Sequence, residues 1–223
     1  MAGYLAVSQD FGKTWQRIGT SLPGKKLPEN ATPWTRDQKS NFRCLFFINM
    51  GKSYGLNKDG YVYALGIGTE WHWTSRNVYL CRVPRENILT YSAYTYFTGL
   101  TAGKPGWSSS QDEALPLNGV QTGQQGSAMF HPQVGRYLFL TESKLYDAPA
   151  PWGPWTVAGT WNAPDCNKTS PDWPINWQGG YMPGIISKDT GPDYFWFTVS
   201  GQHKVPKIAY QLQLGKMRMV LQH

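Results

Sequence analysis

Hydrophobic positions along this chain gather in short segments, and four such segments follow one another between residues 42 and 99. Each is rich in Val, Tyr, Phe and Leu and is bounded by Gly, Pro, Asn or Asp, which is the pattern of a β-strand. The predicted strands are Phe42–Met50, Gly60–Gly66, Asn77–Val83 and Tyr91–Gly99. In Gly60–Gly66 both alternating sets of side chains are apolar, so the sheet must be covered on both faces. This predicts one blade of a β-propeller, with a β-sandwich sheet as the alternative.

The same pattern recurs along the chain and predicts an all-β propeller formed as a single domain over residues 1–223. A hairpin is predicted within residues 3–18, and further whole blades of four strands each within residues 127–159 and 180–221. The predicted strands of these two blades are Ser127–Pro132, Gly135–Thr141, Ser143–Ala148, Pro154–Gly159, Gly180–Ser187, Asp193–Gly201, Lys207–Leu214 and Lys216–Leu221. Three and a half blades are too few to close a ring. We therefore expect either a longer protein of which this is the C-terminal portion, or self-association through the open side.

Residues 8–15, SQDFGKTW, match the Asp-box pattern S-x-D-x-G-x-T-W. In such a turn Asp10 is expected to accept backbone hydrogen bonds, and Gly12 to adopt a positive φ. Trp15 is expected to pack into the blade. The role of this motif is structural, so Asp10 is not a catalytic candidate.

The composition suits a loop-rich all-β protein of the kind that handles sugars, with 15% aromatic and 16% charged residues, 24 Gly, 16 Pro and 11 Trp. The net charge is +7, but the cations are scattered rather than gathered in a basic stripe, so no nucleic-acid partner is expected. No apolar run approaches the roughly 20 residues of a membrane span. The sequons at Asn30 and Asn167 favour a secreted, extracellular protein, although this chain has no signal peptide.

The three cysteines, Cys44, Cys81 and Cys166, lack the spacing of a metal site. Cys44 and Cys81 lie on strands of one predicted blade, where they form either a disulfide or two buried thiols. The sequence also lacks a Gly-rich phosphate loop, and no cofactor or metal is expected.

Several motifs together resemble the DUF4185 group of glycoside-hydrolase-like proteins, over about Tyr4 to Leu214. These motifs are DGYVYALG, VYLCRVP, YTYFTG, GKPGWS, GRYLFL, LYDAPAPWGPWT and the Asp-box. The resemblance implies a five-bladed propeller and, from some members, endo-D-arabinanase activity on a furanoside-containing polysaccharide such as arabinan. Members typically begin with an earlier blade that has no counterpart here, so activity of this chain alone is expected to be weak or absent. The alternatives are a non-catalytic carbohydrate-binding propeller and a purely structural one.

In a propeller, the connectors that enter each first strand and the loops between second and third strands lie on one face. The expected ligand face therefore carries most of the tryptophans, and sugar rings stack on aromatic side chains. The polysaccharide-binding candidates are Trp34, Trp71, His72, Trp107, His131 and Trp177. For His131 the alternative is an ordinary core histidine.

Glycoside cleavage requires two carboxyl groups that flank the scissile bond. Glu70 is the first candidate, because its neighbours Trp71 and His72 would supply the apolar cover that suits a general acid. The further catalytic candidates are Asp37, Asp112 and Glu142. The alternative for each is a solvated loop acid or, for Glu142, a residue that closes a hairpin turn.

Overall fold

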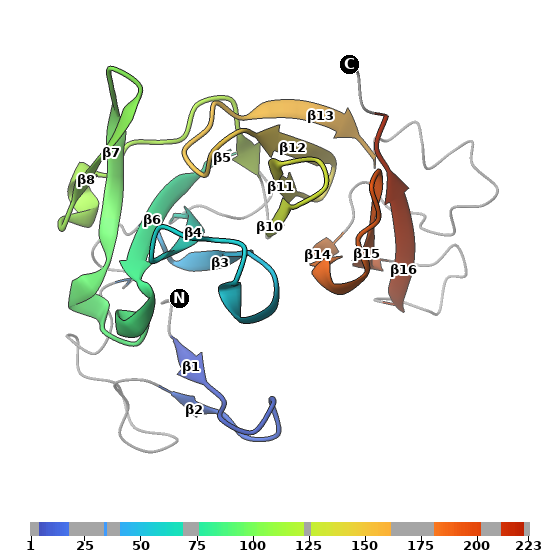
Figure 1. Ribbon diagram of the computed structural model, residues 1–223, viewed down its shortest axis with the longest axis horizontal. Coiled ribbons are helices and arrows are strands. Elements are labelled where there is room, and N and C mark those ends of the chain that lie inside the picture. Colours follow the sequence, from blue (N-terminus) through green and yellow to red (C-terminus); the bar gives the residue numbers. More distant parts are fainter. Residues whose placement is uncertain are drawn as a thin grey trace.

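The computed structural model describes residues 5–17, 34, 41–68, 76–122, 126–161, 181–201 and 211–220. These residues form strands and short 3-10 turns, and no α-helix occurs among them. In Figure 1 three sheets stand around a common centre, and the N-terminal hairpin lies beside the first of them. The prediction of an all-β propeller is confirmed.

Nine strands form one continuous sheet, which we divide at its single parallel pair into a first and a second sheet. The first sheet consists of β3 (Cys44–Asn49), β4 (Tyr61–Ile67), β6 (Tyr79–Pro84), β7 (Thr95–Thr101) and β8 (Lys104–Ser108). The first four correspond to the predicted strands, except that Tyr91–Ala93 forms the 3-10 turn η3 rather than the start of β7. The sequence analysis missed β8, placing its residues in a connector, because Pro and Gly are depleted in strands. Pro105 is tolerated since β8 is an edge strand.

The second sheet consists of β10 (Ser127–His131), β11 (Arg136–Leu140), β12 (Lys144–Ala148) and β13 (Thr156–Thr160), as predicted. Its first strand pairs in parallel with the first strand of the preceding sheet, through Ala128 with Ile48 and Met129 with Asn49. In a propeller, the first strands of successive blades lie side by side around the central axis, as these two do. The two-residue strands β5 (Arg76–Asn77) and β9 (Gln121–Thr122) pair with each other and link two connecting segments.

The third sheet has the order β14 (Tyr181–Ile186), β15 (Tyr194–Gly201), β16 (Gln211–Arg218). The prediction of a break between two strands near Gly215 is wrong, because β16 continues through that glycine. Gly215 pairs with Phe197, and a Cβ atom at Gly215 would lie 2.6 Å from the Phe197 ring. The glycine therefore allows close packing and does not form a turn.

The Asp-box joins β1 (Ala6–Val7) to β2 (Gln16–Arg17). The Asp10 carboxylate accepts hydrogen bonds from the Thr14 amide at 2.8 Å, the Thr14 hydroxyl at 2.6 Å and the Ser8 hydroxyl at 2.8 Å, as the turn role predicts. The prediction that Trp15 is buried is wrong, since its side chain is 66% exposed. Its indole N–H donates to the Gly12 carbonyl oxygen at 3.1 Å, so the ring lies against its own turn.

Hydrophobic cores cover both faces of β4, as its sequence predicts. Tyr63 and Leu65 belong to the core that also contains Phe139 of the second sheet, whereas Val62 and Ala64 belong to the core on the other side. A third core joins the second sheet to the third. Cys44 and Cys81 form no disulfide with each other, because β4 lies between their strands. Two strand spacings amount to about 9.5 Å, too far for a disulfide.

We expect Gly119→Ala to destabilise the protein much more than Gly60→Ala. Both glycines have a φ of 83°, so an alanine at either position incurs the same left-handed backbone penalty, about 1–2 kcal/mol. At Gly119 the added Cβ would also collide with the Trp155 carbonyl oxygen, whereas nothing lies within 4 Å at Gly60. The extra cost should be about 1–3 kcal/mol in urea unfolding. Equal losses for the two variants would contradict this packing.

We expect the Asp10 carboxyl to titrate near pH 2. Its hydrogen bonds, those from Thr14 foremost, lower its pKa from 3.8 to about 2. Because the folded-state pKa is depressed, the contribution of Asp10 to the hairpin is fully present above pH 3.8 and is lost as the pH falls through about 2. An NMR titration of the carboxyl carbon measures this value. Thr14→Val should raise the pKa toward 3.8, and a wild-type midpoint already at 3.8 would contradict the turn geometry.

Candidate functional site

The structure places five of the ten predicted site residues and leaves the other five outside the residues it describes. Outside lie Asp37, Glu70, Trp71, His72 and Trp177. The described candidates are Trp34, Trp107, Asp112, His131 and Glu142.

Glu142 lies in the turn between β11 and β12, and its side chain is half-buried. Its Oε2 atom accepts a hydrogen bond of 3.0 Å from the hydroxyl of Thr122, which is 1% exposed. Thr122 belongs to β9 and pairs with Arg76 of β5. The segment 69–75, which contains Glu70, leads directly into β5. Glu142 is therefore linked through Thr122 to Arg76, the first described residue after that segment.

The sequence analysis did not identify Thr122, although it positions the Glu142 carboxylate. β9 has only two residues, too few to show any hydrophobic periodicity. Its partner strand β5 is 44 residues distant in the sequence, as measured from Asn77 to Gln121. The hydroxyl–carboxylate contact depends on this pairing, and no local motif signals it.

Asp112 lies at the opposite end of the sheets from Glu142. β8 returns along β7, so that Ser108 pairs with Tyr96 near the start of β7. Asp112 follows in the exposed 3-10 turn η4 (Gln111–Glu113), where its amide donates to the Ser110 hydroxyl at 3.3 Å. The prediction that the whole connector 99–126 lies on the ligand face is therefore wrong. The structure does not bring Asp112 together with Glu142.

Trp107 lies on strand β8 rather than in a connector, and its ring takes part in the packing of the first sheet. Its ring centroid is 5.9 Å from that of Phe97 and 6.1 Å from that of Tyr63. The Arg82 guanidinium carbon lies 4.0 Å from the centroids of both Trp107 and Tyr61. One face of the ring expected to stack on a sugar is thus covered by a cation–π contact.

Trp34 and His131 have no exposed surface, so neither can contact a sugar in this structure. The Trp34 indole N–H donates to the Tyr96 hydroxyl at 3.2 Å, in an aromatic cluster with Tyr94. His131 Nδ1 accepts from the Val134 amide at 3.4 Å, which leaves Nε2–H to donate to the Tyr194 carbonyl oxygen 3.2 Å away. His131 thereby links the second sheet to the third. Both residues are core residues, which corrects the ligand-binding prediction for each.

The described residues contain no group of three or more His, Cys, Asp or Glu side chains arranged to hold a metal ion. The same part of the chain has no helix long and apolar enough to span a membrane.

The sheet arrangement defines this chain as a protein of the β-propeller class. The sequence matches the family described as "Domain of unknown function (DUF4185)" over residues 2–211, so the chain belongs to the DUF4185 family. No curated protein matches the sequence.

Among solved structures, the chain is similar to a mutant of the α-L-arabinofuranosidase Arb93A from Fusarium graminearum in complex with an iminosugar inhibitor. The identity is 11% and the TM-score is 0.38, with 96% of this chain and 66% of that chain covered. This chain thus spans slightly less than two thirds of that protein. The TM-score is too low for the likeness to bear on function.

Proposed function

We propose that this chain is a glycoside hydrolase-like protein that acts on a furanoside-containing polysaccharide such as arabinan. Membership of the DUF4185 family agrees with the proposal. The observation that carries it is the link from Glu142 through Thr122 to the β5–β9 pair, which the Glu70 segment enters. Glu142 and Glu70 would be the two carboxyl groups that glycoside cleavage requires.

The contact with Thr122 favours different catalytic roles for Glu142 and Glu70. The hydroxyl holds one oxygen of the Glu142 carboxylate in a fixed direction, and such positioning serves a nucleophile or a base. Glu70, flanked by Trp71 and His72, would then act as the general acid. The tryptophans of this segment, with Trp177, would hold the sugar chain, and Asp37 remains a further candidate acid.

We expect Glu142→Gln to lower the release of reducing ends from arabinan by about 10²-fold or more, the usual effect of losing a general acid or base. Thr122→Val should lower turnover less, because it leaves the carboxylate present but unsupported. Glu113→Gln is the matched control, since it removes the same charge from an exposed position at the opposite end. Wild-type turnover in Glu142→Gln would refute the assignment of this acid.

One observation favours a non-catalytic carbohydrate-binding propeller as the second candidate function. Of the two described catalytic candidates, Glu142 alone lies at its end of the sheets, because Asp112 lies at the other end. A single carboxylate can bind a sugar but cannot supply both groups of the hydrolytic mechanism. Retention on arabinan without any release of reducing ends would favour this function.

We also propose that the protein is secreted, because polysaccharides of this kind are extracellular. We further propose that it self-associates through the third sheet. β16 is the edge of its sheet among the described strands, and its Leu212 and Leu214 side chains are 76% and 62% exposed. Light scattering should give a mass above the 25.2 kDa of one chain. Leu212→Lys with Leu214→Lys should restore the monomer, because charges on an edge strand oppose pairing. Leu89→Lys, at an exposed position in the connection between β6 and β7, is the control. A monomeric wild type would contradict the proposal.

A further inference from the structure

A cleft lies between the second and third sheets, and its lining residue Trp161 adjoins the turn that carries Glu142. Its volume is about 1110 Å³, and its walls come from β11, β12 and β13 on one side and residues 217–220 on the other. Sites for small molecules usually measure about 300–1,000 Å³, so this space is large enough for several sugar units. Apolar side chains, among them Leu138, Leu145 and Met217, alternate in the walls with polar ones.

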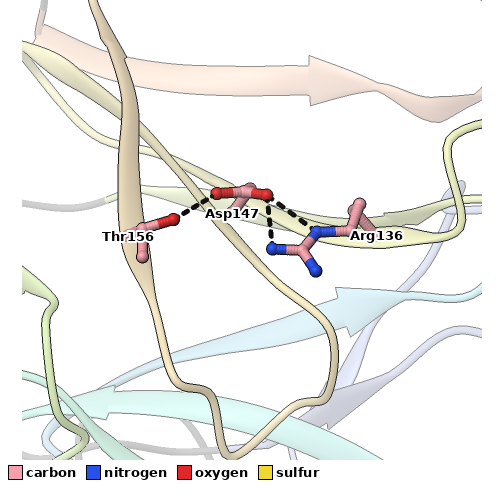
Figure 2. Close-up of polar contacts among 3 residues, drawn as sticks. All are labelled: Arg136, Asp147 and Thr156. Atoms are coloured by element: carbon pink, nitrogen blue, oxygen red, sulfur yellow. Dashed lines mark hydrogen bonds and ion pairs between the residues drawn. The ribbon is translucent and has the colours of Figure 1, made fainter. Parts of the chain in front are cut away.

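Arg136 of β11 and Asp147 of β12 line this cleft, and Thr156 of β13 joins them in a polar cluster (Figure 2). The Nε and Nη2 atoms of Arg136 lie 2.8 and 2.7 Å from Oδ2 of Asp147. The Thr156 hydroxyl donates to Oδ1 of the same carboxylate at 2.6 Å. The side chains of Arg136 and Asp147 remain 34% and 22% exposed. The pair is thus fixed in position and still accessible to a ligand.

The electrostatics of the cluster favour a neutral ligand. Asp147 neutralises Arg136, and an anion would compete with that carboxylate for the guanidinium. Arg218 also borders the cleft, but it directly follows Met217 on β16, and successive side chains of a strand point to opposite faces. The ion pair instead presents N–H donors beside carboxylate acceptors, and this combination matches the neighbouring hydroxyls of a neutral sugar.

Trp161 supplies an aromatic surface in the same cleft. Its indole N–H donates to the Thr141 carbonyl oxygen at 2.9 Å, and its backbone amide donates to the Ser143 carbonyl oxygen at 3.1 Å. Its ring makes an edge contact with Phe197 at 5.2 Å between centroids. A half-buried ring held at these points can pack against the C–H face of a sugar without further ordering.

We propose that this cleft is an accessory binding site for a neutral polysaccharide, which adjoins the turn that contains Glu142 through Trp161. The sugar class rests on the proposed function, whereas the place of the site rests on the cleft, the Arg136–Asp147 pair and Trp161. Arg136 and Asp147 bind hydroxyl groups, and Trp161 with Met217 contacts the apolar face of the sugar chain.

The methionine methyl groups give a direct test. Met217 and Met219 line the cleft, whereas Met50 lies in the core between the first and second sheets. In protein labelled with ¹³C at the methionine methyls, arabinan oligosaccharides should shift the resonances of Met217 and Met219 and leave Met50 unchanged. Polygalacturonate, an anionic glycan, should shift neither; shifts with it would overturn the neutral-ligand argument.

Variants then test the role of the ion pair. Arg136→Ala should weaken oligosaccharide binding at Met217 and Met219 about tenfold. Arg136→Lys should weaken oligosaccharide binding nearly as much, because lysine keeps the positive charge but lacks the planar guanidinium that donates several hydrogen bonds. Arg85→Ala removes one positive charge from an exposed position in the 3-10 turn η2 (Arg85–Asn87), which follows β6, and should leave binding unchanged. Unchanged Met50 resonances verify that each variant is folded.

The outcomes separate this inference from the proposed function. If the wild type is retained on arabinan but Met217 and Met219 do not shift, the accessory site is refuted and the proposed function stands. If the two methyls shift but neither Arg136 variant weakens binding, the role of the ion pair is refuted. Failure of the wild type to bind any arabinan would overturn the proposed function, and the sugar assignment of the cleft with it.

Discussion

The parallel pairing of β3 with β10 is the contact on which the arrangement of the candidate site depends. Two residue pairs, Ile48 with Ala128 and Asn49 with Met129, hold the first strands of two sheets in the same direction at the centre. The later strands alternate in direction, so β4 ends, β6 begins and β11 turns into β12 at the same end of the sheets. The short β5–β9 pair forms at that end and brings the Thr122 hydroxyl to the Glu142 carboxylate.

Covering both faces of aromatic-rich sheets uses many residues that composition alone would assign to a sugar-binding surface. Trp34 donates to the Tyr96 hydroxyl, and Trp155, which is 2% exposed, donates to the Pro151 carbonyl oxygen. Burial raises the pKa of Tyr96 to about 12, so its hydroxyl keeps its proton. A buried polar tip needs a partner of this kind. Trp34 and Trp155 therefore serve the core rather than a ligand surface.

The sequence predicts strands well where the signal is local and poorly where distant residues decide. β4 and β10–β12 follow from runs of apolar and aromatic residues between turn residues. The break expected at Gly215 does not occur, because the neighbouring Phe197 ring makes glycine necessary within the strand. β8 was not predicted because it contains Pro105, and the position of Asp112, which follows β8, was therefore predicted incorrectly. Glu142 could be selected as a loop acid, but its link to Thr122 depends on a strand pair separated by more than forty residues.

The Arg136–Asp147 pair is difficult to explain by stability alone. Ion pairs with this much exposure contribute about 0–1 kcal/mol, and ordering two long side chains offsets part of that. Thr156 adds a third contact that fixes the carboxylate, although the surrounding core of Leu138, Leu145 and Phe195 already joins the two sheets. Fixed polar groups beside an open cleft are instead what recognition requires. A polymer long enough to occupy both this cleft and the Glu142 end would bind the second site at a high effective concentration. The two sites together therefore favour a long polysaccharide over a short oligosaccharide as the ligand.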